Sequence, residues 1–245
     1  MHNREFQEMA LDEESHWWFS GRRLLIREFL HKIDLPENSL ILEVGCGTGG
    51  NLNMLSSFGT VYAFEKNNLA RIIAIDKSQH RIQVSNGSCP NEIPQYDHKF
   101  DLICLFDVLE HIKEDNETIL KLSKFLAQNG KIVITVPAYQ WLFGKHDRAL
   151  KHFRRYSRRG ILHLTHATNL EIQRITHFNF FLAVPIICAR ILSNYLNAPN
   201  SKKTPQLPGI INLILFKIFS LEKFILNKFN MFFGISILVI LKKEN

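Results

Sequence analysis

The stretch ILEVGCGTGGNL, residues 41–52, constrains the fold of this chain more than any other segment. An apolar run that ends in several glycines is typical of a buried parallel strand followed by a tight turn into a helix. Glycines at such a turn let backbone N–H groups approach a ligand without an intervening side chain. The segment therefore predicts an α/β fold with a ligand site at the carboxyl end of its first strand.

Short apolar runs alternate with amphipathic stretches along most of the remaining chain. This alternation predicts a mostly parallel sheet that is covered by helices on both faces. Strands are expected at residues 39–44, 60–65, 82–88, 100–106, 131–136, 170–176 and 234–243. Helices are expected at residues 20–33, 51–59, 68–77, 114–130 and 157–168.

The carboxyl-terminal part departs from this alternation of strands and helices. Two apolar helical stretches, at residues 178–196 and 210–229, are separated by a polar, Pro-rich loop at residues 197–209. We therefore expect one domain over residues 1–245. It divides into an N-terminal helical cap (1–34), a cofactor-binding core (39–176), a helical insertion (178–232) and the last strand (233–243).

Charge and cysteine content bear on where such a protein works. The net charge is +7, and residues 145–174 hold eight Lys or Arg against Asp147 and Glu171. Such a segment suits an anionic ligand or surface, and it is equally typical of a solvated basic face. No cysteines form a C-x-x-C pair, the first residues lack the character of an export signal, and no apolar run reaches about 18–20 residues. These features predict a cytoplasmic protein with reduced cysteines, and they leave association with a membrane surface open.

The glycines of the first turn fit two different rules. Gly45, Gly47 and Gly50 spell the G-x-G-x-x-G of dinucleotide enzymes, whereas Gly45, Gly47 and Gly49 spell a G-x-G-x-G loop. The glycines alone therefore do not identify the cofactor.

Three acids narrow the choice of cofactor. Glu65 ends the second predicted strand, where a carboxylate can accept hydrogen bonds from ribose hydroxyls, and Asp76 would take that role if residues 72–76 formed a strand instead. Glu43 precedes the glycines within a buried strand end, where an acid would repel a pyrophosphate but attract a cation. Glu43 therefore favours S-adenosylmethionine, which carries an ammonium and a sulfonium.

Four segments in this order carry a resemblance to a known family: LEVGCGTGGN, VYAFE, FDLICLFDVLEHI and GKIVITVPA. In this combination the chain resembles the class I S-adenosylmethionine-dependent methyltransferases of the type 11/12 group. A looser resemblance, through HWWFSGRR at residues 16–23 and through residues 146–156, points to a subgroup with this start. The resemblance implies a Rossmann-like, doubly wound sheet of seven strands with the last strand antiparallel.

The resemblance also implies how this sequence holds the cofactor. The methionine end lies against Glu43 and the glycine loop, the ribose against Glu65, the adenine against the turn after the third strand, and the sulfonium above the turn after the fourth. The cofactor-binding residues expected in this way are Glu43, Gly45, Cys46, Gly47, Gly49, Asn51, Glu65, Lys66, Ser88, Cys89, Asp107, Val108 and Leu109.

Methyl transfer is an in-line displacement from an activated sulfonium, so the protein has mainly to align the acceptor and exclude water. A base is required only when the acceptor must lose a proton. His111, His146 and Tyr156 are the candidate catalytic residues, although each side chain is also compatible with a purely structural role. Glu110, His111 and His146 match no familiar ligand spacing, so no metal is expected.

The expected acceptor is a small molecule or a lipid-linked molecule. Nucleic acid is not expected, because no nucleic-acid-binding module is recognisable. The helical insertion at residues 178–232 leaves open a peripheral membrane contact or a homodimer. Two alternatives remain: a non-catalytic S-adenosylmethionine-binding protein that acts at membranes, and an NAD-dependent oxidoreductase.

Overall fold

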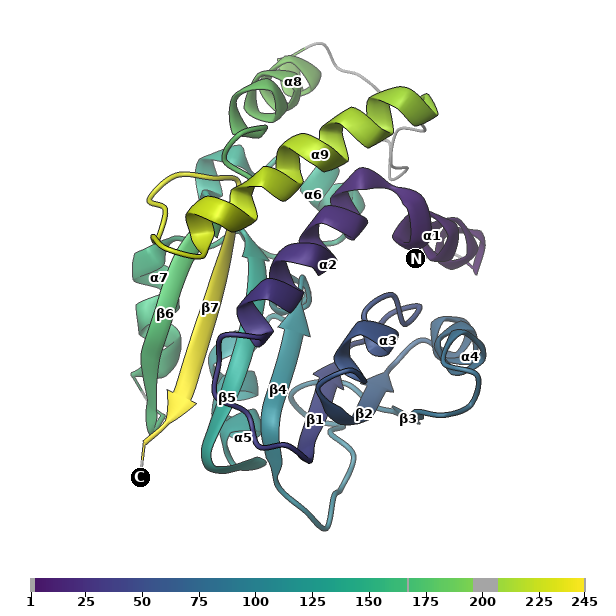
Figure 1. The fold of residues 1–245 in the computed structure, drawn as a ribbon, viewed down its shortest axis with the longest axis vertical. Coiled ribbons are helices and arrows are strands. Elements are labelled where there is room, and N and C mark those ends of the chain that lie inside the picture. Colours follow the sequence, from purple (N-terminus) through teal and green to yellow (C-terminus); the bar gives the residue numbers. More distant parts are fainter. Residues whose placement is uncertain (1–2, 167, 196–206, 245) are drawn as a thin grey trace.

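The computed structural model describes residues 3–166, 168–195 and 207–244. In these ranges a seven-stranded sheet has the order β3-β2-β1-β4-β5-β7-β6 (Figure 1). Strands β1 to β5 pair in parallel, whereas β7 runs antiparallel to both β5 and β6. The strands are β1 (Ser39–Val44), β2 (Gly59–Glu65), β3 (Gln83–Asn86), β4 (Phe100–Phe106), β5 (Leu126–Pro137), β6 (Leu170–Phe178) and β7 (Ser236–Lys243). The expected Rossmann-like sheet with an antiparallel last strand is confirmed.

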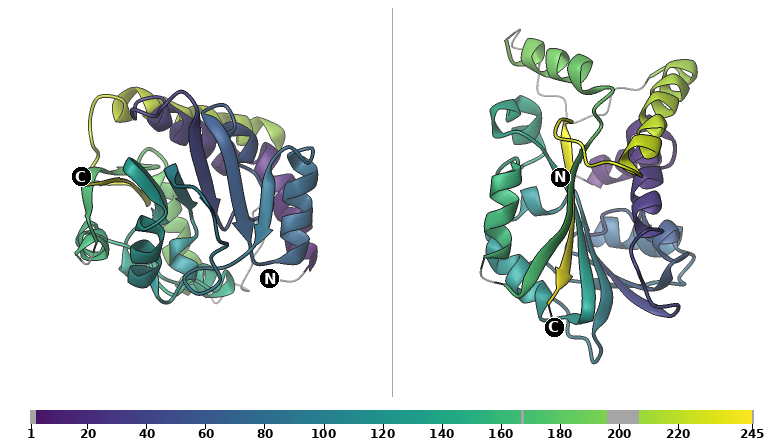
Figure 2. Two further views of the ribbon diagram at one scale, coloured as in Figure 1. Left: turned by 90° about the horizontal axis from the view of Figure 1, so that it is seen from below. Right: turned by 60° about the vertical axis from the view of Figure 1, so that its left-hand side comes forward.

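Helices cover both faces of this sheet, as Figure 2 shows. Because side chains alternate along a strand, Ile41 of β1 packs on one face and Leu42 on the other. One face is covered by α2 (Trp17–Leu30), α3 (Leu52–Leu55), α4 (Asn68–Lys77) and α9 (Gly209–Leu226). The other face is covered by α5 (Asp115–Ser123) and α7 (Arg158–Thr165). Burial on both faces explains why the central strands read as continuous apolar runs.

The strand order reverses at β1, which lies between β2 and β4. In open α/β sheets a ligand crevice forms beyond the carboxyl ends of the strands at such a point. The turns after β1, β2 and β4 meet at this edge, so the topology itself locates the candidate site.

Two helices precede the sheet, although the sequence predicted only one that begins near residue 20. Helix α1 (Asn3–Ser15) comes first, and α2 begins at Trp17 after His16, whose Nδ1 accepts a hydrogen bond from the Trp18 N–H at 3.3 Å. The Trp18 ring stacks on Phe219 of α9 with 5.5 Å between centroids. A Cβ at Gly21 would overlap the same Phe219 ring, so this glycine permits the close approach of α2 and α9.

The helical insertion contains α8 (Ala183–Tyr195) and α9, in agreement with the two predicted helices. Most of the predicted Pro-rich loop, residues 197–206, lies outside the described residues. Helix α9 is anchored by Glu222, a fully buried residue whose carboxylate accepts hydrogen bonds from the N–H groups of Asn179 at 2.6 Å, Phe180 at 2.7 Å and Phe181 at 3.0 Å. Within the described ranges, none of the helices combines the length and apolar character that a membrane crossing requires.

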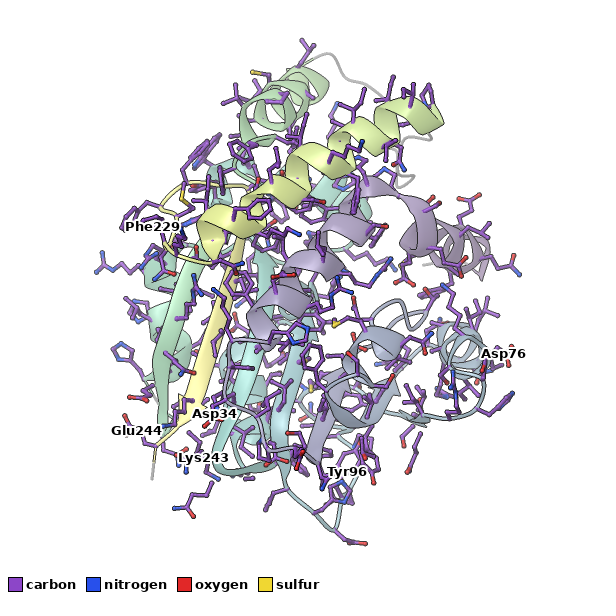
Figure 3. The ribbon with its side chains drawn as sticks, viewed as in Figure 1. Asp34, Asp76, Tyr96, Phe229, Lys243 and Glu244 are labelled. Carbon is purple, nitrogen blue, oxygen red and sulfur yellow. The ribbon has the colours of Figure 1, made fainter. Side chains whose placement is uncertain are left out.

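Two sequence-based expectations about local structure are wrong. The helix predicted at residues 114–130 ends at Ser123, because Leu126 pairs with Phe100 of β4 and residues 126–130 extend β5. The rival strand that would end at Asp76 is part of α4 instead. The Asp76 side chain is 66% exposed and lies at the outer rim of the molecule (Figure 3).

Candidate active site

A cavity of about 2010 Å³ opens at the carboxyl edge of β1, β2 and β4. Its walls come from α1, α2, the turns after these strands, and helices α6 (Lys145–Ala149), α8 and α9. Binding sites for drug-sized ligands usually occupy about 300–1,000 Å³. The cavity therefore has room for two ligands, such as a cofactor and an acceptor.

The glycine loop after β1 adopts a backbone that only glycine tolerates easily. Gly45, Gly47 and Gly49 have φ angles of +62°, +56° and +82°. A Cβ on Gly45 would lie 3.0 Å from Cγ1 of Val108, and one on Gly49 would lie 2.9 Å from Cα of Ala74. Gly45 and Gly47 line the cavity, whereas Gly49 supports the loop from behind.

Glu65 connects the ends of β1 and β2. Its carboxylate accepts hydrogen bonds from the Gly47 N–H at 3.1 Å and from the Asn67 N–H at 2.7 Å. A carboxylate offers about four acceptor sites. Glu65 thus retains capacity for further donors, such as ribose hydroxyls, on the cavity side.

Glu43 is a buried acid, and one of its two carboxylate oxygens has no hydrogen-bond partner among the described residues. Its Oε1 accepts a hydrogen bond from Nδ2 of Asn51 at 2.9 Å, and its Oε2 has no partner among the described residues. Burial raises the pKa of Glu43 to about 8, and nearby Glu13 adds to the rise. An unsatisfied buried carboxyl is costly unless a donor or cation completes it. The side chain is therefore suited to a cationic group in the cavity.

Helix α1 adds an acid that sequence reasoning missed. Glu13 is buried and accepts a hydrogen bond from the Thr48 hydroxyl of the glycine loop. Lys77 of α4 lies 3.5 Å from the same carboxylate. These contacts hold α1 over the loop, and no sequence signal identified them because they join three distant segments.

The turn after β3 forms another part of the wall. Ser88 and Cys89 line the cavity together with Lys66, which follows Glu65. The Ser88 hydroxyl donates a hydrogen bond to Glu92 at 2.8 Å. Burial raises the pKa of the Cys89 thiol to about 12, so the thiol remains neutral at physiological pH. This wall is uncharged at Ser88 and Cys89, as the face of an adenine would require.

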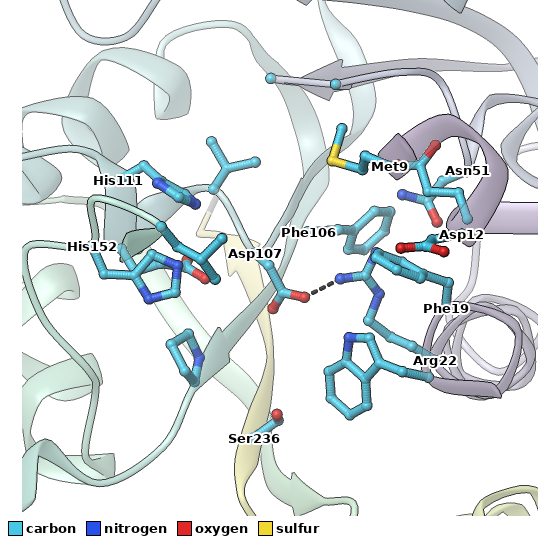
Figure 4. A pocket seen from close by; sticks show the side chains of 18 of the residues that line it. Met9, Asp12, Phe19, Arg22, Asn51, Phe106, Asp107, His111, His152 and Ser236 are labelled. Carbon is cyan, nitrogen blue, oxygen red and sulfur yellow. Dashed lines mark hydrogen bonds and ion pairs between the residues drawn. The ribbon is translucent and has the colours of Figure 1, made fainter. Parts of the chain in front are cut away.

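Asp107 and Val108 occupy the turn after β4, and Asp107 has a φ of +54°. The Asp107 carboxylate forms an ion pair with Arg22 of α2 and accepts a hydrogen bond from the Thr135 hydroxyl at 3.1 Å. Figure 4 shows Asp107 between two groups of side chains, with Asn51 and Met9 on one side and His111 and His152 on the other. The Asp107 side chain therefore lies between two halves of the cavity, and Arg22 reaches it from the side of Asn51.

We call these the cofactor half and the acceptor half. The cofactor half contains Glu43, Gly45, Cys46, Gly47, Asn51, Glu65, Lys66, Ser88 and Cys89. Of the residues expected beside the sulfonium, Val108 lines the cavity, and Leu109 is fully buried outside its wall. The structure thus brings together most of the predicted cofactor residues.

The acceptor half is built by the short helix η1 (Leu109–His111), by α6 and by α8. Asp147 of α6 is fully buried; its Oδ1 lies 3.0 Å from Nδ1 of His152 and 2.8 Å from Nε of Arg155. Arg190 of α8 lies 3.6 Å from Oδ2 of Asp147. Burial alone would raise the pKa of Asp147, but the His152 hydrogen bond and the Arg155 charge lower it well below its usual value. Asp147 is therefore a fixed anion that positions three cationic or imidazole groups.

The three candidate catalytic residues lie in different surroundings. His111 opens onto the cavity, and burial within the surrounding protein, with His152 nearby, lowers its pKa to about 4. His146 also lines the cavity, and burial together with Arg190 lowers its pKa to about 4. Tyr156 is buried outside the cavity wall, where its hydroxyl donates to Asp115 at 2.9 Å. Both histidines are thus neutral at pH 7, and Tyr156 joins structural elements.

The chain matches known proteins in sequence and in fold. The family model of a methyltransferase domain, Methyltransf_23, matches residues 18–180, more than half of the chain. Phosphoethanolamine N-methyltransferase 1 of Zea mays is 27% identical over 114 residues, which are 44% of this chain and 23% of that enzyme. The matched segments span less than half the length of the curated relatives.

Two solved structures show the same fold. A putative methyltransferase from Bacillus halodurans has a TM-score of 0.62 at 16% identity and covers 90% of this chain and 99% of its own. N-methyltransferase NodS from Bradyrhizobium japonicum, solved with S-adenosyl-L-homocysteine, has a TM-score of 0.59 at 14% identity and covers 95% and 91%.

Fold and site together define a class I methyltransferase. The chain belongs to the family of methyltransferase domains, and its cofactor is S-adenosylmethionine. The residues present fit this cofactor, because the orphaned Glu43 oxygen suits its ammonium and the remaining Glu65 sites suit its ribose. The oxidoreductase alternative is thereby set aside, whereas the subgroup suggested by residues 16–23 stays a prediction.

The raised pKa of Glu43 predicts that cofactor affinity depends on pH. A carboxyl with a pKa of about 8 is mostly protonated at pH 6–7, and it must lose its proton to pair with an ammonium. Affinity for S-adenosylhomocysteine should therefore rise about tenfold per pH unit between pH 6 and 7. Calorimetry at both pH values measures the change, and Glu43→Gln should show almost none. Equal pH dependence in both proteins would contradict the role of Glu43.

Proposed function

We propose that this methyltransferase acts on an acceptor that joins an anionic group to an apolar portion, as in a lipid-linked molecule. In this proposal the cofactor occupies the cofactor half, with Asp107 and Val108 beside the sulfonium. The acceptor occupies the acceptor half. Bound there, S-adenosylmethionine supplies an activated methyl group, and the chain aligns the acceptor with it and excludes water.

One observation carries this proposal, namely that apolar and basic side chains line the same cavity. Helix α8 supplies apolar surface through Ile186 and Ala189. Leu215 of α9 and Leu207, which precedes that helix, supply more. Arg155 and Arg190 lie beside the carboxylate of Asp147, so two guanidinium groups flank this one acid. Arginine suits phosphate or carboxylate groups because its guanidinium can donate two parallel hydrogen bonds.

His111 and His146 are proposed to orient the acceptor. Both imidazoles are neutral at pH 7, so each can accept a hydrogen bond from an acceptor hydroxyl or amine. Such a group also receives a proton where the acceptor must lose one during transfer. Tyr156 is proposed to act indirectly, since its hydroxyl donates to Asp115 and to the carbonyl of Leu109.

The insertion also supports peripheral membrane contact, which would bring a lipid-linked acceptor to the cavity. Several large apolar side chains of α8, α9 and the following turn are exposed, including Leu192, Ile210, Phe224 and Phe232. Lysines on α9 and beyond, such as Lys223, would favour an anionic surface. A homodimer through the same residues is the competing proposal, and sedimentation with phosphatidylglycerol vesicles distinguishes the two.

A matched pair of variants tests the acceptor class. Leu215 lines the cavity, whereas Leu213 on the same helix is exposed outside it. With methyl-labelled S-adenosylmethionine and a total lipid extract, label should enter the organic phase. Leu215→Lys should reduce this transfer at least about tenfold, because it places a charge against the apolar portion. Leu213→Lys should leave it within about twofold, and neither change should alter affinity for S-adenosylhomocysteine. Label found only in water-soluble products would contradict a lipid-linked acceptor.

A further inference from the structure

Two segments that are distant in sequence meet at the wall of the acceptor half. The backbone N–H of Phe153 donates to the carbonyl of Glu110 at 2.8 Å, which holds the segment after α6 against η1. As a result, one potential ligand atom from each of Glu110, His111 and His152 lies within 4.8 Å of the others. The His111 and His152 rings are nearly perpendicular, with 4.5 Å between their centroids, and lie next to one another in Figure 4.

Glu110 is a buried acid with one carboxylate oxygen that lacks a partner among the described residues. Its side chain is almost fully buried, with 1% of the residue exposed, and its Oε2 has no hydrogen-bond partner in the part of the chain that the structure describes. A buried carboxylate oxygen without a donor is costly, and a cation bound between this oxygen and the two imidazoles would satisfy it.

His152 is oriented in the way that metal-binding histidines usually are. Its Nδ1 faces Oδ1 of Asp147 at 3.0 Å, and Asp147 is itself fixed by Arg155 and by the Gly144 N–H at 3.0 Å. The Asp147 oxygen at this distance favours the tautomer that carries its hydrogen on Nδ1, which leaves the lone pair on Nε2. A carboxylate behind a histidine that fixes its tautomer and ring direction is the common outer shell of metal sites.

We propose that Glu110, His111 and His152 bind one divalent transition-metal ion in the acceptor half. Two imidazoles and one carboxylate suit zinc, cobalt, manganese or iron better than magnesium or calcium, which prefer oxygen ligands. Bonds of about 2.1 Å would place the ligand atoms about 3.5 Å apart, so a small side-chain rotation closes the site. His146, which the sequence grouped with Glu110 and His111, is not part of this cluster.

Three protein ligands leave at least one coordination position open. Glu110, His111 and His152 all line the cavity, so the open position faces the space assigned to the acceptor; this assignment rests on the proposed function. An acceptor oxygen bound to the ion would be held across Asp107 from the cofactor half. With metal bound, the imidazole lone pairs are occupied, and His111 then positions the acceptor through the ion instead of acting as a base. The proposal replaces the sequence-based expectation that no metal binds.

Metal titration of the full chain tests the site without any acceptor. After treatment with a chelator, the protein should bind one equivalent of zinc by calorimetry. Cobalt should give visible absorption bands that zinc removes. His152→Ala and Glu110→Gln should each weaken zinc binding about 100-fold, and Asp147→Asn about 10-fold because it only orients His152. His163→Ala, a change on α7 outside the cluster, should have no effect.

A second measurement separates a lost site from a lost fold. Each variant should retain the unmodified protein's affinity for S-adenosylhomocysteine, because the three ligands lie outside the cofactor half. Absence of a one-equivalent site, or equal zinc affinity in His152→Ala and the unmodified protein, would overturn the proposal. Either result would leave the acceptor experiment with Leu215→Lys untouched, so the two proposals fail independently.

Discussion

Glu65→Ala should weaken binding of S-adenosylhomocysteine at least about 100-fold. The ribose hydroxyls of the ligand would lose two charge-assisted hydrogen bonds to the Glu65 carboxylate, each worth about 1.5–3 kcal/mol. It would also release the Gly47 and Asn67 N–H groups that it now holds, so the glycine loop would lose its shape. Isothermal calorimetry on the unmodified protein and the variant measures the difference directly.

Asp76→Asn is the matched control for this prediction. Asp76 was the rival ribose ligand in the sequence, but it lies on α4 with its side chain 66% exposed. Its removal should leave affinity within about twofold, whereas Glu65→Gln, which keeps one acceptor oxygen, should lie between Glu65→Ala and the unmodified protein. A loss in Asp76→Asn, or unchanged affinity in Glu65→Ala, would disprove the assignment of Glu65.

Glu222→Ala should lower the free energy of unfolding by about 3 kcal/mol. Three backbone N–H groups at the end of β6 would lose their shared acceptor, and buried donors without partners cost about 1–3 kcal/mol each before water compensates. Urea unfolding without ligand measures the loss. Glu117→Ala, an exposed helix position paired with Lys121, should change stability by less than about 1 kcal/mol. Equal stability of the two variants would contradict the anchoring role of Glu222.

The same residue predicts a pH dependence of stability. Burial raises the pKa of Glu222 to about 7, although three N–H groups oppose the rise. Between the ordinary glutamate pKa of 4.5 and about 7, the folded protein therefore retains a proton that the unfolded chain has released. The contribution of Glu222 to the free energy of unfolding is complete below its pKa in the unfolded chain, and it declines as pH rises through this window. Relative to Glu222→Gln, the unmodified protein should therefore be less stable at pH 7 than at pH 5. Urea unfolding of both proteins at both pH values measures this change.

Local patterns predicted the sheet well because its strands are buried on both faces. β1 and β4 have the bounds that their apolar runs indicated, and the turn after β1 has positive φ angles at Gly45, Gly47 and Gly49. Prediction failed at residues 124–130, where Leu126 has helical spacing from Ile119 and Leu122. Pairing of Leu126 with Phe100 overrode that periodicity, and only tertiary contact could reveal it.

The two halves of the cavity differ in how well the sequence predicts their residues. The cofactor half is built mainly from strand ends and their turns, so its residues could be read from local motifs. The acceptor half depends on contacts between distant segments, such as Arg22 with Asp107 and Arg190 with Asp147. The sequence named His146 as a candidate catalytic residue, whereas the structure pairs the neighbouring Asp147 with His152, which the sequence did not single out. Spacing along the chain carries no signal for such long-range pairs.

Calorimetric titration with S-adenosylhomocysteine tests the central claim most directly, because it asks whether the glycine loop, Glu43 and Glu65 form the cofactor site of a methyltransferase. The account predicts binding of one equivalent, affinity at least about 100-fold weaker in Glu65→Ala, and no displacement of the ligand by a nicotinamide dinucleotide. Absence of binding at millimolar S-adenosylhomocysteine and S-adenosylmethionine would contradict it.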